Sequence, residues 1–262
     1  MFPPDLPPVS NKLLYAWRVF AKWLSFFIFG LISLIGGILV FPIMRIFIHP
    51  KIKFQKYGRR ATTLFFKVFI SIMRFLGIVN LEPDNRENYR RLSSKIIVAN
   101  HPSLLDVVML ISLIPNADCI VSSNLRNNIL SAVVRQLYIL NSRELDDILN
   151  ACTETLKQGN CLIIFPEGTR TPRTGRNILR KGSARIALAS GCNIVPVQIG
   201  GTDKFGLGKK DPWPGFNPRE KYIYRLTMKD EINPEKYKDI PAAAAAKQLT
   251  DEIETSLFQN KK

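Results

Sequence analysis

The chain is poor in the side chains that bind metals or form disulfide frameworks. Its 262 residues include only two histidines and four cysteines. The cysteines are Cys119, Cys152, Cys161 and Cys192; they match no zinc-site spacing and are too sparse for a disulfide framework. No HExxH sequence is present. The sequence therefore predicts reduced thiols, no metal and no cofactor.

Several signatures of common enzyme classes are absent as well. There is no GxxxxGK[ST] phosphate-binding loop and no GxSxG nucleophile elbow, so nucleotide hydrolysis and serine-hydrolase chemistry lack their usual motifs. No repeat recurs at a fixed period. The length favours one α/β domain with a short appendage rather than two full domains.

Acidic residues are scarce relative to basic ones. The chain has 21 Asp and Glu against 37 Lys and Arg, a formal net charge of +16. Such an excess indicates an anionic partner, which is a nucleic acid, an anionic membrane face or a phosphorylated substrate. Because the chain also carries a long apolar stretch and no nucleic-acid recognition motif, we expect no nucleic acid among its partners.

The apolar stretch lies near the N-terminus. Residues 1–11 are proline-rich and predict an irregular lead-in, whereas residues 23–44 form 22 consecutive positions without a charge. A helix of that length can cross a hydrocarbon core of ~30 Å. Gly36, Gly37 and Pro42 predict a bend, which leaves a course within one leaflet open. A cleaved signal peptide fits less well, because no small-x-small site is visible.

Residues 59–79 predict a second helix, with a thin polar stripe on a wide apolar surface. Such a helix suits the membrane interface, although a core helix covering a sheet is the alternative. More basic residues follow the first stretch than precede it, so the bulk of the chain is expected to be cytoplasmic if that stretch spans. We therefore divide the chain into membrane-associating helices at 1–80 and an α/β domain at 81–262.

The rest of the chain alternates between short apolar runs and helical periodicity. Strands are predicted at 95–100, 118–123, 137–140, 161–165, 193–199 and 222–228. Helices are predicted at about 103–114, 125–136, 143–157 and 180–190, the last closed by Gly191, with a terminal helix from about Pro241. Alternation of this kind predicts an α/β fold, a mostly parallel sheet with helices packed on it.

A histidine and an acid stand five positions apart where a predicted strand ends, in the sequence NHPSLLD at 100–106. Pro102 suits a first helical turn, which predicts His101 at the helix cap and Asp106 in the second turn. If the two side chains meet, the carboxylate orients the imidazole, and the other ring nitrogen can take a proton from a hydroxyl. The alternative is a capping histidine beside an unrelated surface acid.

The sequence FPEGTR at 165–170 follows another predicted strand. If the two strands are parallel, this loop lies on the same edge of the sheet as His101. Arg170 offers a planar fork suited to phosphate, and Glu167 could accept a hydrogen bond from an acceptor hydroxyl or hold Arg170. The basic residues that follow, at 173–185, favour phosphate binding over a merely solvated charge run.

These motifs resemble the glycerolipid acyltransferase family, whose best-known bacterial members are the 1-acyl-glycerol-3-phosphate acyltransferases. NHPSLLD matches the family's NHxxxxD block, FPEGTRT at 165–171 matches FPEGTRS with Thr171 for Ser, and IVPVQI at 194–199 matches the VPV-type block. Within that last block Pro196 predicts a strand edge or a bulge. The GxxFIxR-like block falls on 135–141 and is degenerate, with Arg135 at the glycine and Asn141 at the arginine. The resemblance covers about residues 90 to 200.

The resemblance implies transfer of a fatty acyl group from acyl-CoA or acyl-carrier protein to the free hydroxyl of 1-acyl-glycerol-3-phosphate in phospholipid synthesis. The implied catalytic residues are His101 and Asp106. The implied substrate-binding residues are Asn100, Ser103, Glu167, Gly168, Thr169 and Arg170. Membrane phospholipids are the further implied partners, with the chain at the inner (cytoplasmic) membrane and its active site facing the cytoplasm.

Two alternatives remain open at this point. The missing arginine of the second block suggests another acceptor, such as a lyso-aminolipid or a specialised-metabolite alcohol. A non-catalytic membrane protein that binds anionic lipid through its basic face would also account for the charge and the apolar stretch.

Overall fold

The computed structural model describes residues 6–121, 139–140, 145–212 and 214–259. The strands are β1 (Val79–Pro83), β2 (Ile96–Ala99), β3 (Ala117–Val121), β4 (Ile139–Leu140), β5 (Cys161–Ile164), β6 (Ile194–Gly201) and β7 (Tyr222–Met228). They form one sheet in the order β1-β7-β6-β2-β5-β3-β4. Every neighbouring pair is parallel except β6 and β7. The predicted α/β fold with a mostly parallel sheet is confirmed.

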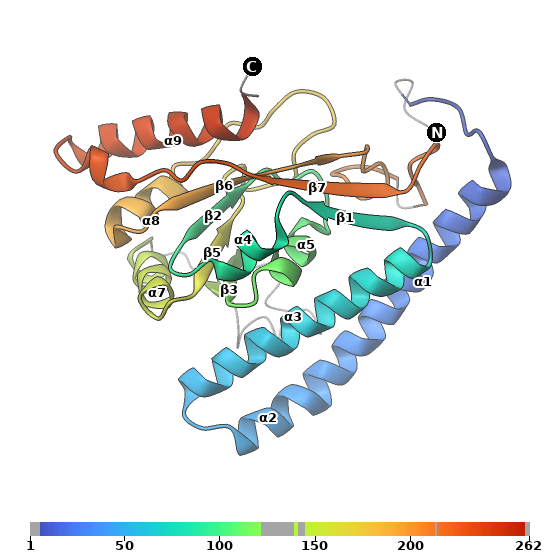
Figure 1. Ribbon diagram of the computed structural model, residues 1–262, viewed down its shortest axis with the longest axis horizontal. Coiled ribbons are helices and arrows are strands. Elements are labelled where there is room, and N and C mark those ends of the chain that lie inside the picture. The colour runs from blue at the N-terminus through green and yellow to red at the C-terminus, as the bar shows by residue number, and fades with distance from the viewer. Residues whose placement is uncertain (1–5, 122–138, 141–144, 213, 260–262) are drawn as a thin grey trace.

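Helices cover both faces of this sheet (Figure 1). The helical elements are α1 (Lys12–Ile35), η1 (Gly36–Val40), α2 (Phe41–Phe47), α3 (Lys51–Phe75), α4 (Arg86–Arg91), α5 (Asp106–Leu113), α7 (Leu145–Lys157), α8 (Gly182–Ser190), η3 (Pro234–Tyr237) and α9 (Ala242–Phe258). As predicted, Gly191 ends α8 in the left-handed conformation, with φ of 67°.

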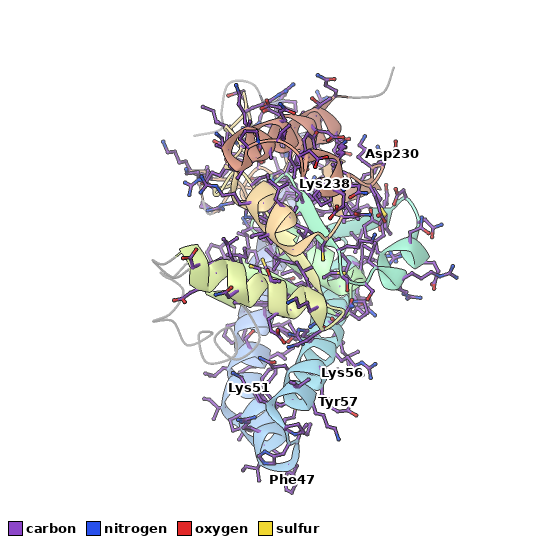
Figure 2. The ribbon with its side chains drawn as sticks, turned by 90° about the vertical axis from the view of Figure 1, so that its left-hand side faces the viewer. Phe47, Lys51, Lys56, Tyr57, Asp230 and Lys238 are labelled. Atoms are coloured by element: carbon purple, nitrogen blue, oxygen red, sulfur yellow. The ribbon has the colours of Figure 1, made fainter. Side chains whose placement is uncertain are left out.

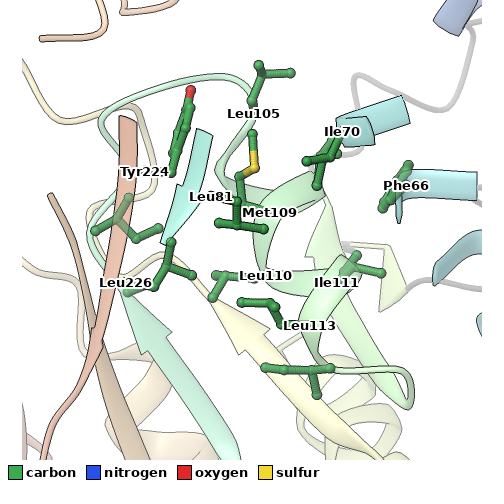
Figure 3. Packing of buried hydrophobic residues seen from close by; sticks show 14 of the residues in the cluster. Phe66, Ile70, Leu81, Leu105, Met109, Leu110, Ile111, Leu113, Tyr224 and Leu226 are labelled. Atoms are coloured by element: carbon green, nitrogen blue, oxygen red, sulfur yellow. The ribbon is translucent and has the colours of Figure 1, made fainter. Parts of the chain in front are cut away.

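The central strands are buried on both sides, because their successive side chains point to opposite faces. In β2, Ile96 and Val98 contribute to a core shared with α7, α8 and α9. Ile97 and Ala99 point the other way, into a larger core formed with α3 and α5. Figure 3 shows part of this second core, where residues of α5 such as Met109 pack beside Tyr224 of β7. Two apolar layers thus fix the central strands in place.

A long helical arm extends from one side of the sheet (Figure 1). It consists of α1, η1, α2 and α3, which run out and back as an antiparallel pair. The segment Lys12–Phe47 is the one helix of the described chain that is long and apolar enough to cross a membrane. At Gly36 and Gly37, where a bend was predicted, the structure has η1, a π-helical turn that begins at Gly36, and the helix continues through it into α2.

The arm shares the core of the α/β body. Met73 of α3 is fully buried, and Phe69 is 1% exposed. The helix predicted at 59–79 was expected either at the membrane interface or as a core helix that covers the sheet. One face of α3 covers the sheet, and the other face leaves Leu64, Val68 and Phe75 exposed. The domain boundary predicted at residue 80 falls inside β1, which was not predicted as a strand because the helical pattern was extended to residue 79.

The interpretation of Pro196 as a strand-edge residue is wrong, because β6 lies between β7 and β2. Ile194 pairs with Ile232, and Val197 pairs with Met228. Residues 229–231 therefore lie opposite only two residues of β6, 195 and 196. The bulge is therefore on the partner side, in residues 229–231. The helix predicted at 125–136 lies outside the described residues, as do five of the seven positions of the degenerate motif at 135–141. Half of the strand predicted at 137–140 is described, and it forms β4.

Candidate active site

The candidate site lies where two parallel strands end. Val98 of β2 pairs with Ile164 of β5 in parallel register, so the segments after these strands begin at the same edge of the sheet. The backbone joins them directly, since the Thr171 N–H donates to the His101 carbonyl at 2.7 Å. The structure therefore brings together the two motifs that are more than sixty positions apart in the sequence.

His101 and Asp106 are in contact. The Nδ1 atom of His101 lies 2.8 Å from Oδ2 of Asp106, whose side chain has no solvent exposure. The backbone N–H and the hydroxyl of Ser103 also donate to this carboxylate, at 2.7 and 2.6 Å. The Asp106 carboxylate only accepts hydrogen bonds, so the His101 Nδ1 that contacts it carries a hydrogen. In the neutral ring the lone pair is therefore on Nε2.

The ring of His101 is held on its flat side as well. Phe165 stacks on it, with ring centroids 4.2 Å apart and planes 24° apart. The His101 side chain keeps 19% of its surface exposed. An imidazole held by a carboxylate and an aromatic ring, and still partly exposed, is preorganised for proton transfer.

The predicted position of His101 at a helix cap is wrong. Helix α5 begins at Asp106 with Leu105 as its cap, and Asp106 is in its first turn rather than its second. The carboxylate binds the Ser103 N–H, which holds residues 101–105 in a turn ahead of the helix. Asp106 contacts His101 from the first position of α5. Pro102 lies in the turn before the helix and does not begin it.

Glu167 holds the site together from inside. Its side chain is 3% exposed, and it accepts hydrogen bonds from the His101 N–H at 3.2 Å and from the Thr171 hydroxyl. Asn177 donates to its other oxygen at 2.6 Å. Two roles were predicted for Glu167: to hold Arg170, or to accept a hydrogen bond from an acceptor hydroxyl. None of these contacts is with the Arg170 side chain, and the buried carboxylate has little surface to offer a substrate.

Arg170 is oriented by backbone carbonyls instead. Its Nη1 donates to the carbonyls of Leu207 and Gly208, at 2.9 and 2.8 Å. A planar guanidinium held along one edge can still present its other donors to an anion. Arg170 and Thr169 are half-buried, and Gly168 is exposed.

Gly168 has a conformational requirement. Its φ is +65°, and a Cβ there would come within 2.7 Å of the Arg180 Nε. The absence of a side chain lets Arg180 cross the loop closely.

Asn100 and Ser103 are at the site, but their polar groups are engaged within the protein. Asn100 exchanges two hydrogen bonds with the backbone of Ile199, at 2.9 and 2.7 Å, and so connects β2 to β6. Both side chains are buried, Ser103 completely. Their contacts indicate that they position the loop that carries His101.

Three residues near His101 were not singled out in the sequence as site residues. Thr171 accepts from the His101 N–H at 2.9 Å, and its place in the FPEGTRT motif could have revealed it. The Tyr224 hydroxyl lies 2.7 Å from the Ser103 hydroxyl, and Lys204 lies with Nζ 4.6 Å from the centre of the Tyr224 ring. No local motif marks these last two, because β7 and the loop after β6 reach the site only in the folded chain.

Lys204 is an unusual cation beside this network. It is 7% exposed, and its Nζ donates to the carbonyls of Ile223 at 2.9 Å and Gly200 at 3.3 Å. Burial lowers the pKa of Lys204 to about 8, against a smaller opposing effect of the negative charge of Asp106. Lys204 therefore loses its proton at a lower pH than an exposed lysine does.

A cleft of about 210 Å³ borders the catalytic loop. Pro102, Thr171, Arg173 and Lys204 are among its lining residues. A second, mainly apolar groove of about 470 Å³ lies between α1 and the loop after β6, where Val19 and Phe20 face Phe205 and Pro214. Among the described residues, no group of three or more His, Cys, Asp or Glu side chains could hold a metal ion.

Known proteins resemble the chain over this region. Residues 80–200 match the family described as Acyltransferase. The 1-acyl-sn-glycerol-3-phosphate acyltransferase of Helicobacter pylori is 31% identical over 187 residues, which cover 68% of this chain and 71% of that protein. A chloroplastic 1-acyl-sn-glycerol-3-phosphate acyltransferase of Arabidopsis thaliana is 28% identical over 60% of this chain, and the match spans about half of that relative's length, 46%.

A solved structure has the same fold. The crystal structure of the 1-acyl-sn-glycerophosphate acyltransferase of Thermotoga maritima superimposes with a TM-score of 0.65 at 22% identity, covering 94% of this chain and 100% of that one. The family match contains both the His101 loop and the Arg170 loop, and the similarity to the Helicobacter relative extends over most of both chains. The chain therefore belongs to the glycerolipid acyltransferase family of the 1-acyl-glycerol-3-phosphate acyltransferases.

Proposed function

We propose that this protein transfers a fatty acyl group from a thioester donor to the free hydroxyl of 1-acyl-glycerol-3-phosphate, as a step of phospholipid synthesis. The observation that carries the proposal is the His101 imidazole, bound through Nδ1 to a buried carboxylate at the edge of the sheet. The names of the relatives support the choice of acceptor. The donor is acyl-CoA or acyl-carrier protein.

In the proposed reaction, Nε2 of His101 takes the proton of the acceptor hydroxyl as its oxygen attacks the thioester carbonyl. The protonated ring is stabilised by Asp106. Collapse of the tetrahedral intermediate breaks the carbon–sulfur bond, and the departing thiolate takes the proton from the imidazolium. The products are the new ester and a free thiol, so no covalent acyl-enzyme is needed.

Substrate binding is assigned to the cleft and the groove beside the site. We assign the acceptor phosphate to the cleft side of the Arg170 loop, where Arg170 supplies positive charge. Arg173 also lines this cleft, paired with Asp203 at 2.8 Å. The apolar groove between α1 and Pro214 suits a fatty acyl chain, which gains roughly 0.8 kcal/mol for each methylene buried. We place the helical arm at the inner (cytoplasmic) membrane, with the site facing the cytoplasm.

The direct test incubates the purified full-length protein with labelled acyl-CoA or acyl-carrier protein and a panel of acceptors. Formation of diacyl product from 1-acyl-glycerol-3-phosphate is expected. Product from a phosphate-free acceptor alone would refute the assignment of acceptor and would favour the lyso-aminolipid or alcohol alternative. The donor that supports turnover identifies the thioester.

Replacing the base provides the test of mechanism. His101→Ala is expected to lower kcat by about 10²- to 10⁴-fold, the usual contribution of a general base. The matched control is His49→Ala, because His49 is the chain's other histidine and lies exposed on the helical arm. Equal activity of the two variants would contradict the assigned base and support a non-catalytic lipid-binding role.

A further inference from the structure

Helix α1 carries a lysine with no exposed surface. Lys22 is fully buried, whereas Phe20 and Trp23 on the same helix are 57% and 43% exposed. Taking an ammonium group out of water costs free energy unless hydrogen bonds and opposite charge replace its hydration. An apolar side chain can fill the same space without that cost. The presence of a charge here therefore directs attention to the groups that Lys22 binds.

Lys22 binds the loop that follows β6. Its Nζ donates to the Gly215 carbonyl at 2.5 Å and to the Gly206 carbonyl at 3.4 Å. The two glycines approach each other so closely that a Cβ on Gly206 would lie 1.9 Å from the Gly215 carbonyl oxygen. Asp211, between them in the sequence, supplies a negative charge that attracts the ammonium group. One side chain of α1 thus joins the two sides of this loop.

The same loop orients Arg170. Oδ2 of Asp211 accepts hydrogen bonds from the N–H groups of Gly206 and Gly208, both at 2.9 Å. The carbonyls of Leu207 and Gly208 accept from Nη1 of Arg170, at 2.9 and 2.8 Å. Hydrogen bonds therefore connect α1 to the Arg170 guanidinium through one short segment, 206–208. A misplacement of about 1 Å in a group that positions a substrate can cost on the order of 10²-fold in rate.

The loop is held from two sides, by the sheet and by the helical arm. The sheet holds its start, where the Tyr222 hydroxyl donates to the Phe205 carbonyl at 2.7 Å. Lys22 holds the following segment from α1. Figure 2 shows the arm projecting from the α/β body, with Phe47 at its far end. The part of the chain assigned to the membrane therefore contributes directly to the geometry of the Arg170 loop.

We propose that Lys22 is a positioning residue for acyl transfer, which fixes the loop after β6 so that Arg170 is held ready for the acceptor phosphate. Lys22 is buried and acts through Arg170 rather than on the substrate itself. Acceptor binding thereby depends on a contact made by the helical arm, whereas the proton transfer at His101 does not. This inference rests on the proposed function, in which Arg170 binds the acceptor phosphate.

The first experiment compares two single variants of the full-length protein in mixed micelles with 1-acyl-glycerol-3-phosphate. Lys22→Met removes the buried ammonium group, and Lys12→Met makes the same change at an exposed lysine of the same helix. Lys22→Met is expected to raise KM for the acceptor about tenfold, the effect of a hydrogen bond from a charged group, and to leave kcat within about threefold. Lys12→Met is expected to stay within about twofold in both. A KM of Lys22→Met equal to that of the control would overturn the proposal.

The second experiment tests whether Lys22 acts through Arg170. The effect of Lys22→Met on kcat/KM is measured in the unaltered chain and again in a chain that already carries Arg170→Gln. Residues that act through a shared contact have effects that do not add. We expect about a tenfold loss in the first case and less than about twofold in the second. An equal loss in both cases would show a general effect on the fold and would overturn the positioning role.

A third measurement requires no turnover. Amide hydrogen exchange of residues 206–212 is expected to be about tenfold faster in Lys22→Met than in Lys12→Met, with exchange in β2 and β5 unchanged. Equal exchange of the loop in the two variants would overturn the proposal. Lys22→Gln, which keeps an amide donor, is expected to give smaller changes in the same direction and serves if Lys22→Met does not fold. Absence of acyl transfer by the unaltered chain would refute the proposed function and leave the exchange result in place.

Discussion

At the scale of single residues, the candidate site depends on buried groups that hold others in position. Asp106 satisfies three donors at once, and Glu167 receives the backbone N–H of the residue that carries the imidazole. Removing one member leaves a buried donor or acceptor without a partner, which costs more than the lost hydrogen bond itself. Small side-chain changes are therefore expected to have measurable effects.

Thr171 allows this to be tested with a closely matched control. Thr171→Val keeps the shape of the side chain but removes the hydroxyl that bonds the His101 N–H and Glu167. We expect kcat to fall by about three- to tenfold, the effect of one hydrogen bond. Thr171→Ser keeps the hydroxyl and is expected to stay within about twofold of the unaltered chain. An unchanged kcat in Thr171→Val, or an equal loss in both variants, would contradict the role assigned to the hydroxyl.

Lys204 gives the protein a pH-dependent stability. The pKa of Lys204 is lowered by burial from 10.5 to about 8 in the folded chain. Between these values the unfolded chain binds more protons, so this group raises the free energy of unfolding as pH rises from about 8 to about 10.5, and its contribution is constant below that window.

Lys204→Met removes this titration. The difference in unfolding free energy between the unaltered chain and the variant is expected to rise across the same window, by up to about 3 kcal/mol. Denaturant unfolding at a series of pH values measures it. A difference that stays flat from neutral to alkaline pH would contradict the lowered pKa.

At the scale of elements, the site depends on loops whose conformation only glycine permits. The loop after β6 carries the Leu207 and Gly208 carbonyls that orient Arg170. Its Gly206 has φ of +89°, and a Cβ there would lie 1.9 Å from the Gly215 carbonyl oxygen. The loop can close in this way only without a side chain at that position.

Gly206→Ala is therefore expected to lower the free energy of unfolding by roughly 1–3 kcal/mol or more and to raise KM for the acceptor as Arg170 loses its support. Gly182→Ala is the control, because a Cβ at the start of α8 meets no atom within 4 Å. That control is expected to be neutral or stabilising by about 0.5–1 kcal/mol. Thermal unfolding and steady-state kinetics of both variants provide the comparison, and equal stability would contradict the strained-loop argument.

Local sequence signals specify some of the elements and not others. The strand Tyr222–Met228 was predicted with the observed bounds, because alternating apolar residues are a local signal. Strand β1 was missed, because residue 79 follows a helix without a break in apolar character. The cap predicted from Pro102 failed because a carboxylate four positions later bound the backbone of Ser103, a contact that no local propensity encodes.

At the scale of the whole molecule, the α/β body and the arm are joined by one apolar core, yet the arm keeps large apolar side chains in contact with solvent. Phe27 is 70% exposed and Leu31 is 48% exposed on α1. An exposed apolar surface of this kind marks an interaction with a membrane or another protein. We propose a membrane, because the same helix is long and apolar enough to enter one.

Phe27→Gln with Leu31→Gln tests that placement. Losing two side chains that would each gain about 1.5–3 kcal/mol on burial is expected to weaken vesicle binding by roughly 10²-fold or more. The exchange Phe27→Leu with Leu31→Phe keeps the apolar character and is expected to bind as the unaltered chain does. Flotation measures binding, and thermal unfolding checks the fold. Unchanged binding of the glutamine variant would show that α1 does not contact the bilayer.

Local sequence was enough to predict the fold class, the apolar arm and the two motifs of the site, because each of these depends on residues close together along the chain. The folded chain adds the groups that support Ser103, the neighbour of Asp106, because the Tyr224 hydroxyl reaches the Ser103 hydroxyl and Lys204 lies over the Tyr224 ring. A pocket at the edge of the sheet opposite His101, lined by Lys56, Arg59, Arg60 and Arg90, likewise combines α3, α4 and the segments before β3 and β5. Contacts between distant segments depend on how the chain packs, and packing is a property of the whole core rather than of any local pattern.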